Sequence, residues 1–295
     1  MRCGRSRRGG GLVFEQRVAQ DVIKGAAFSP DGRHLAVTGN GMAQLLVFDT
    51  QTWAATTPPN AQTLRRVVIL ADGSVIGQNY GTTLHRWIPT GDPAVPWRHQ
   101  RRTMDAIMLD LAAPPTGERA LMVDERGWIT EITPGAELDA SLSVLWTQPG
   151  LLGADASADG RHVYAIAADR LLLLDRSPGA GRVAQIELRR EIPVPGTLRD
   201  VALSPDERLV AIGAIDGHAY VFRAADNRLL ATLSGHTEPV AAVEFASAAR
   251  LLTASWDHSA RVCDLSTLDT PAQTLIRDIR HDWGITLQDA LSAWK

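Results

Sequence analysis

Cysteine is nearly absent from this chain of 295 residues, because only Cys3 and Cys263 occur. Two cysteines exclude a framework of several disulfides and every zinc site built on cysteine clusters, and their scarcity fits a reducing compartment. Aromatic residues are also few, at 5% of the chain. No stretch approaches the roughly 18 apolar residues of a membrane-spanning helix. We therefore expect a cytoplasmic protein without a membrane partner.

Signatures of common enzymes are missing as well. The sequence has no Gly-x-Ser-x-Gly nucleophile elbow, no Gly-x-x-x-x-Gly-Lys phosphate loop and no His-Glu-x-x-His zinc motif. Its eight histidines include no pair at a spacing typical of metal ligands. Its carboxylates are spread through turns, where aspartate shapes the backbone. We therefore expect no catalytic residue, no metal site and no cofactor.

Net charge does not single out a partner either. The formal value of −3 is too small to indicate nucleic acid or a membrane surface. The first eight residues, MRCGRSRR, contain four arginines and no acid, but the apolar stretch that follows at 12–14 is too short for a secretory signal. Residues 1–10 are predicted to be a disordered basic tail. Nucleic-acid binding through this tail is a weak rival hypothesis.

What the sequence does contain is a turn signal that recurs along its length. Ser-Pro-Asp-Gly at 29–32 has weaker counterparts, and one anchor residue from each turn gives positions 31, 72, 116, 159, 206 and 248. Successive anchors are 41 to 47 residues apart. Apolar runs of strand length lie before and after the turns, as at 201–203 and 209–212. Short β-type segments that repeat at such a period predict an all-β repeat protein.

Six units of four strands predict a β-propeller, in which antiparallel sheets surround a central channel. One four-stranded sheet cannot cover both of its apolar faces, so each sheet must pack on two neighbours. We assign residues 11–280 to this propeller, with six recognisable blades in a ring of six or seven. Residues 12–19 are expected to form a strand that completes the blade at the closure point. Residues 281–295 are expected to form a short C-terminal helix.

The stretch 235–264 carries a family likeness. It begins with Gly-His at 235–236, continues through two apolar strands separated by a turn aspartate, and ends with Cys-Asp at 263–264. This layout resembles the WD40 repeat, with Cys-Asp in place of Trp-Asp. Weaker copies of the closing dipeptide stand at 48–49 and 174–175. The resemblance implies a WD40-type β-propeller.

The resemblance also implies a buried hydrogen-bonded network within the repeat. The residues at the matching positions are His236, Thr253, Asp257 and Cys263. Because a thiol does not donate as an indole does, we expect the network to be shorter by one member here. His236 and Asp257 are then structural and not a catalytic pair. The other five units lack the histidine and are expected to be held by packing alone.

A further implication of the resemblance is the place where a partner binds. In WD40 repeats the residue before the turn aspartate lies on one face of the propeller and often contacts partners. Trp256 matches this position best, with Ile215, Ala168 and Tyr80 in looser equivalents. Aromatic residues are enriched at binding hot spots, so Trp256 is a candidate recognition anchor. The alternative is that a neighbouring loop covers it.

A second class of position lies on the innermost strand, where three units carry a cation: Lys24, Arg65 and Arg199. Three cations at the mouth of one channel would attract an acidic or phosphorylated segment. The alternative is that they pair with local acids such as Asp21 and Asp200.

We therefore interpret the chain as a non-catalytic WD40-like scaffold that binds a protein or peptide partner. The acidic or phosphorylated groups would belong to the partner. The chain would be the sensor or partner-binding part of a bacterial signalling system, for example one linked to a kinase or an ATPase. The alternative function is a propeller enzyme, a hydrolase or lyase with its site at the central channel. Acidic residues or histidines that converge on the channel would favour that alternative.

Overall fold

The computed structural model describes residues 23–39, 45–61, 63–135, 137–177, 185–266 and 268. The expected basic tail at 1–10, the expected strand at 12–19 and the expected helix at 281–295 lie outside these residues. No helix among the described residues is long and apolar enough to cross a membrane.

The described strands form six antiparallel sheets, each built from strands that are consecutive in the sequence. The first sheet contains β1 (Ile23–Phe28), β2 (His34–Gly39), β3 (Leu45–Asp49) and β4 (Ala55–Thr56). The second contains β5 (Leu64–Ile69), β6 (Val75–Asn79), β7 (Thr83–Pro89) and β8 (Trp97–Thr103). The third contains β9 (Met108–Ala112), β10 (Ala120–Asp124), β11 (Trp128–Ile132) and β12 (Leu142–Thr147), with a 3-10 helix η1 (Leu138–Ser141) before β12.

The remaining three sheets repeat this order. The fourth contains β13 (Leu151–Ala156), β14 (His162–Ala167), β15 (Arg170–Ser177) and β16 (Gln185–Pro193). The fifth contains β17 (Leu198–Leu203), β18 (Leu209–Ala214), β19 (Ala219–Arg223) and β20 (Leu229–Leu233). The sixth contains three described strands, β21 (Val240–Ser247), β22 (Arg250–Ser255) and β23 (Ala260–Asp264).

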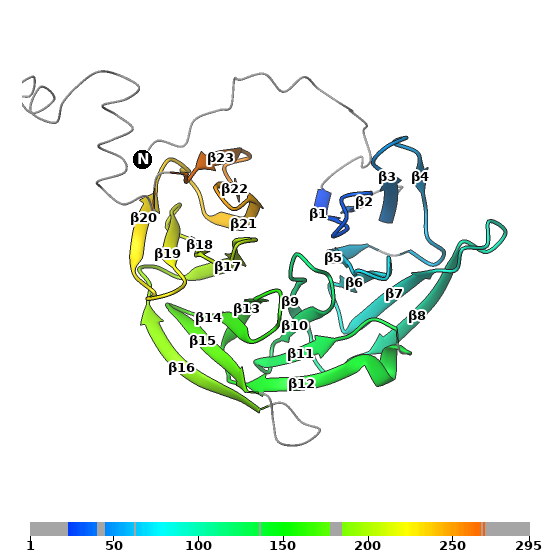
Figure 1. The fold of residues 1–295 in the computed structure, drawn as a ribbon, viewed down its shortest axis with the longest axis horizontal. Coiled ribbons are helices and arrows are strands. Elements are labelled where there is room, and N and C mark those ends of the chain that lie inside the picture. Colours follow the sequence, from blue (N-terminus) through cyan, green and yellow to red (C-terminus); the bar gives the residue numbers. More distant parts are fainter. Residues whose placement is uncertain are drawn as a thin grey trace, which may run out of the picture.

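The six sheets surround a common centre in sequence order, as Figure 1 shows. The first strand of each sheet is innermost, and the fourth strands, such as β8 and β16, lie at the periphery. Consecutive innermost strands contact each other from β1 to β5 and onward to β21. The predicted all-β propeller with six blades is therefore confirmed.

The recurring turn joins the first and second strands of the sheets, and its side chains explain why it recurs. In the first sheet the Ser29 hydroxyl donates to Asp31 at 2.6 Å, and Asp31 accepts the amide N–H of Arg33 at 3.0 Å. Gly32 completes the turn with a φ of 69°, which favours glycine. The same serine–aspartate contact occurs at Ser157–Asp159 and Ser204–Asp206, both at 2.7 Å. Short polar side chains that bind their own backbone therefore set the strand reversals.

The hydrophobic core is divided into clusters, each between two neighbouring sheets. Between the first and second sheets, Ala36 and Leu45 pack with Leu64 and Val67. Corresponding clusters lie at the next four junctions, up to the one between the fifth and sixth sheets. Each sheet therefore depends on its neighbours for burial, as the repeat architecture requires.

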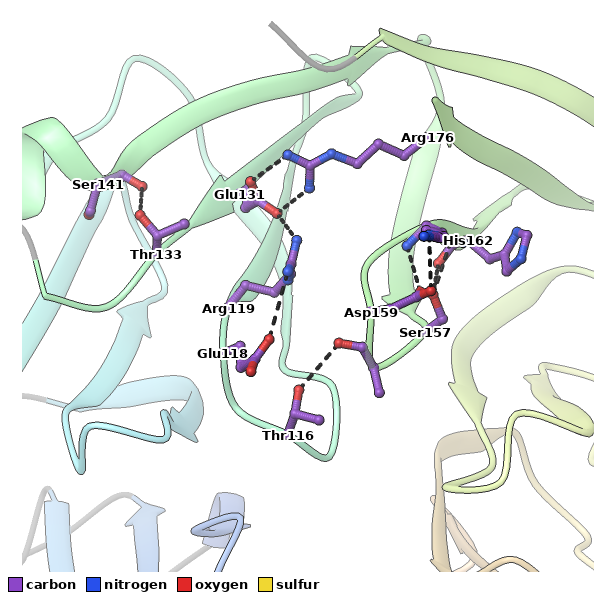
Figure 2. Close-up of polar contacts among 12 residues, drawn as sticks. Thr116, Glu118, Arg119, Glu131, Thr133, Ser141, Ser157, Asp159, His162 and Arg176 are labelled. Carbon is purple, nitrogen blue, oxygen red and sulfur yellow. Dashed lines mark hydrogen bonds and ion pairs between the residues drawn. The ribbon is translucent and has the colours of Figure 1, made fainter. Parts of the chain in front are cut away.

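One of these junctions also contains a buried ion cluster, shown in Figure 2. Glu131 on β11 accepts hydrogen bonds from Arg119 of its own sheet at 2.9 Å and from Arg176 on β15 at 2.7 Å. The second guanidinium nitrogen of Arg176 lies 3.3 Å from the other carboxylate oxygen. Glu131 is 4% exposed, so the cluster joins the third and fourth sheets in a place that little water reaches.

Three peripheral strands, β4, β8 and β12, are not anticipated by the apolar pattern of the sequence. The longest of them, β8, reads WRHQRRT and therefore resembles a charged loop. In the structure Arg98 and Arg102 on this strand pair with Glu137 and Asp139 of the third sheet, at 2.7 and 2.9 Å. Backbone pairing with β7 and these charge pairs, and not apolar alternation, hold this strand.

Candidate partner-binding rim

The two classes of candidate binding residue come together at one end of the propeller. Because the strands are antiparallel, the start of each innermost strand pairs with the end of the second strand, as Leu198 pairs with Ala214. The loop that leaves the second strand therefore emerges beside the start of the innermost strand. We call the set of residues at this end the rim, which consists of Lys24, Arg65, Tyr80, Arg199, Ile215 and Trp256.

A β-bulge presents the cations at the rim. The register of β17 against β18 shifts between Leu198 and Asp200, so that Arg199 has no cross-strand partner. The same shift leaves Lys24 unpaired in β1 and Arg65 unpaired in β5. A bulge leaves its extra residue outside the ladder and re-aims its side chain. In the fourth and sixth sheets the bulge instead presents Leu152 and Ala241.

Two of these cations lie over aromatic rings of the following sheet. The Arg199 guanidinium is 4.8 Å from the ring centroid of Trp256, and the Lys24 ammonium is 5.7 Å from that of Tyr80. Both distances are within the range of cation–π attraction. Trp256 is 54% exposed and Tyr80 53% exposed. Neither ring is therefore covered by a neighbouring loop, and Ile215, at 41% exposed, adds apolar surface at the same end.

No carboxylate of the described residues lies within ion-pair distance of Lys24, Arg65 or Arg199. Asp200, the suggested partner of Arg199, instead lies 3.2 Å from Arg66 and accepts the amide N–H of Val243 at 2.8 Å. The expectation that Asp200 neutralises Arg199 is therefore wrong. Asp21 lies outside the described residues.

Arg65 is half-buried. It donates to the carbonyl oxygen of Met108 at 3.4 Å. Burial and the nearby Arg66 guanidinium lower the pKa of Arg65. An arginine remains charged at neutral pH even so, and an anion near the rim would relieve this repulsion.

Beneath the rim, carboxylates converge on the channel and tie the innermost strands together. Asp110 on β9 accepts the amide N–H of Ala154 on β13 at 3.2 Å. Asp155 on β13 accepts the amide N–H of Leu203 on β17 at 2.8 Å. Asp200 on β17 in turn accepts the amide N–H of Val243 on β21. Each acid thus satisfies a backbone donor of the next sheet. The sequence pattern did not reveal this series, although its members recur about one unit apart.

Arg66 is the basic member of this channel group. Its guanidinium lies 3.3 Å from Asp110 and 3.2 Å from Asp200. The charge of Asp110, followed by that of Asp200, raises the pKa of Arg66. One arginine does not balance four acids, however, because Asp155 and Glu244 also line the channel. Burial raises the pKa of Asp155 to about 7 and that of Asp200 to about 6. Desolvation, with Asp155 and Asp200 nearby, raises the pKa of Glu244 to about 8, although this residue is exposed.

We expect these raised values to make the propeller less stable as the pH rises from 7 to 9. A carboxyl group with a higher pKa in the folded state stabilises the fold at low pH, and this contribution is lost as the pH rises through the folded value. Urea unfolding at pH 7 and pH 9 measures the effect. The Glu244→Gln variant should show a smaller loss than the wild type. An equal loss in the two proteins would contradict the assignment of Glu244.

The network of the sixth sheet joins His236, Thr253, Asp257 and Ser259. His236 Nδ1 lies 2.9 Å from Asp257 Oδ2, and its Nε2 lies 2.8 Å from Thr253 Oγ1. The Ser259 hydroxyl donates to Asp257 at 2.6 Å and, with His236, lowers the pKa of Asp257. Cys263 is 3% exposed and packs in the apolar cluster between the fifth and sixth sheets. The resemblance to the WD40 repeat did not identify Ser259 as a member of this network.

The expectation that the other sheets rest on packing alone is wrong. In the fifth sheet the Tyr220 hydroxyl donates to Asp216 at 2.6 Å. In the third sheet Arg126 binds Asp124 at 2.6 Å and lies over the ring of Trp128, 3.9 Å from its centroid. The turn aspartate therefore keeps its role with a different donor.

Histidines meet in the second sheet, away from the rim. His85 Nδ1 lies 3.1 Å from His99 Nε2, and both rings stack with Trp87. Burial lowers the pKa of His85 to about 4. The pair was missed because its members lie on two neighbouring strands, 14 residues apart. Among the described residues no group of three or more His, Cys, Asp or Glu side chains could hold a metal ion.

Comparisons with known proteins agree with this architecture. Residues 227–264 match the family model described as "WD40: WD domain, G-beta repeat", and they comprise β20 and the three strands of the sixth sheet. The fold is similar to the crystal structure of the Cps50 (Swd1) beta-propeller domain of Myceliophteria_thermophila, with a TM-score of 0.67 and 13% sequence identity over 85% of each chain. The sequence matches no curated protein. The described residues thus form a six-bladed β-propeller, which contains a WD40 repeat at residues 227–264.

Proposed function

We propose that this chain is a non-catalytic platform that binds a protein or peptide partner at the rim. WD40 propellers generally mediate protein–protein interaction, which supports this class of function. The observation that carries the proposal is the exposed Trp256 beside Arg199, a cation without a carboxylate partner in the described part of the chain. Exposed aromatic and arginine side chains are the residues most enriched at binding hot spots.

The rim favours a partner with acidic or phosphorylated groups. Lys24, Arg65 and Arg199 supply positive charge, whereas Tyr80 and Trp256 supply apolar area within contact of two of those cations. A carboxylate or phosphate could accept hydrogen bonds from the guanidinium groups while an adjacent apolar side chain covers the indole. A cytoplasmic location and a sensor role in a bacterial signalling system belong to the same proposal. The proposed cytoplasmic location rests on the scarcity of cysteine.

The charge component predicts salt-sensitive binding. We expect capture of the partner from a lysate of the source organism to fall steeply as sodium chloride rises from about 0.05 to 0.5 M, because the Debye length shortens over this range. The Arg65→Gln/Arg199→Gln variant should bind weakly at low salt and show a flatter salt dependence. Quantitative mass spectrometry of the captured protein measures both effects.

The matched control for this experiment is Arg161→Gln. Arg161 is equally charged and 72% exposed, but it lies in the turn between β13 and β14, at the end of the propeller opposite the rim. Capture by this variant should equal that of the wild type. Capture that does not change with salt, or a loss that is the same in the control, would contradict the proposal.

A second candidate function is a propeller enzyme, because acids converge on the channel. Asp110, Asp155 and Asp200 each bind a backbone N–H of the next sheet, which supports a structural role for them. Glu244 is the acid without such a contact among the described residues. A hydrolase or lyase activity that is lost in Glu244→Gln while partner capture is retained would favour the enzyme.

A further inference from the structure

The sixth sheet leaves uncovered a face that every other sheet buries. The central residue of the second strand points toward the following sheet, and in the sixth sheet this residue is Leu252, 38% exposed. The residues in the same register position of the first five sheets are at most 4% exposed: Ala36, Ile76, Leu121, Tyr164 and Ala211. Leu252 therefore faces a position that no described sheet fills.

The first sheet shows the complementary defect. Phe28, on the side of β1 that faces the preceding sheet, is 61% exposed. Its counterparts Ile69, Leu203 and Phe245 in other sheets are between 3% and 6% exposed. In Figure 1 the first and sixth sheets are the two ends of the arc of blades. We call the pair of faces that carry Leu252 and Phe28 the open junction.

Two polar features at the open junction are also incomplete. Glu244 lies in the register position of Asp155, whose carboxylate binds an N–H of the next sheet, but Glu244 has no such partner among the described residues. The sixth sheet has three described strands where the others have four, so the outer edge of β23 has no described strand beside it. An unpaired strand edge favours pairing with another strand, and an exposed apolar face favours burial against another segment.

We propose that the C-terminal segment of this chain, residues 269–295, covers the open junction. The segment follows β23 directly, at the sheet that lacks its cover. In the other sheets five to nine residues separate the third strand from the fourth, namely 50–54 in the first sheet and 133–141 in the third. A fourth strand at 274–279 would follow β23 after the nine residues 265–273, which fits this range.

The rest of the segment matches the apolar faces of the open junction. Leu287, Leu291 and Trp294 share one face of a helical pattern. A helix of 15 residues would be about 22 Å long, close to the roughly 20 Å of a six-residue strand such as β22. Burial of these side chains against Leu252 and Phe28 would remove both exposed faces from water. The apolar face of the segment and the exposed apolar faces of the open junction would therefore bury each other.

Site-specific photo-crosslinking tests this assignment. A benzophenone amino acid in place of Leu252 in the purified full chain should crosslink, on irradiation, to peptides from residues 281–295 of the same molecule. The same probe in place of Val144, an apolar residue that is 47% exposed on the peripheral strand β12, should give no such product. Peptide mass spectrometry identifies the crosslinked residues, and gel electrophoresis separates intramolecular from intermolecular products.

Each other outcome overturns the proposal. Crosslinks from position 252 to residues 1–22 would assign the cover to the N-terminal segment, and a crosslinked dimer would assign it to a second copy of the chain. The absence of any product would leave the face open to solvent. As a second measurement, Leu291→Asp should abolish the crosslink to 281–295 and speed amide hydrogen exchange in β21 and β22. Unchanged crosslinking in this variant would also contradict the proposal.

Discussion

Replacement of Trp256 by alanine is expected to weaken partner capture at least about 30-fold while the propeller stays folded. Truncation of a hot-spot aromatic costs about 2 kcal/mol or more, and 1.4 kcal/mol corresponds to about a factor of ten. The indole is 54% exposed, and it lies beside Arg199 and not in a core cluster, so the fold should lose little. Titration of the captured partner against each protein measures affinity, and thermal unfolding measures stability.

Val144→Ala is the control for this experiment, because Val144 is apolar and 47% exposed but lies on β12, at the periphery of the third sheet. It should leave capture unchanged. Trp256→Phe should retain part of the affinity, since the smaller ring keeps an aromatic face for Arg199. Wild-type affinity in Trp256→Ala would contradict the role of this residue.

Replacement of Glu131 by alanine is expected to lower the free energy of unfolding by about 3–5 kcal/mol. Glu131 is 4% exposed and binds two arginines, Arg119 and Arg176, whose side chains are 19% and 23% exposed. Removal of the carboxylate leaves Arg176 without this counter-charge between the third and fourth sheets, and it leaves Arg119 only the exposed Glu118, at 4.0 Å. Urea unfolding followed by tryptophan fluorescence measures the loss.

The matched control is Glu137→Ala, which breaks the exposed ion pair with Arg98. The side chain of Arg98 is 54% exposed and that of Glu137 is 66% exposed. An exposed pair contributes about 0–1 kcal/mol, so this variant should unfold close to the wild type. In the double variant Glu131→Ala/Arg176→Ala the loss should be smaller than the sum of the two single losses, because the second change removes an uncompensated charge. A loss below about 1 kcal/mol in Glu131→Ala would show that the cluster does not join the sheets.

The parts of the fold that sequence reasoning could predict are those that local chemistry decides. The turns at Ser29–Asp31 and Ser204–Asp206 are built by side chains two residues apart, so their recurrence gives the period directly. The apolar strands beside those turns are buried at the junctions between sheets, and they follow the same period. The WD40 likeness was clear at 235–264 because the Gly-His, Asp and Cys-Asp positions are all local in sequence, and the family match covers that stretch.

The parts that sequence reasoning missed depend on contacts between distant residues. Strand β8 pairs with β7 and makes charge pairs to the third sheet, so no apolar alternation marks it. Asp200 pairs with Arg66, 134 residues away across the channel, whereas its neighbour Arg199 turns toward Trp256. The β-bulge at Arg199 is the reason that these two neighbouring side chains have different partners. Residue types alone do not reveal where a bulge lies. The cations and the exposed aromatic residues of the rim were identifiable one by one, but their pairing was not.

Amide hydrogen exchange of the chain with and without its captured partner tests the central claim most directly. The account predicts slower exchange in the loops that carry the rim residues, at 80–82, 215–218 and 256–259, and no change in the turns at 30–33, 158–161 and 205–208 at the other end. Protection of those turns with unchanged exchange at the rim would contradict the account.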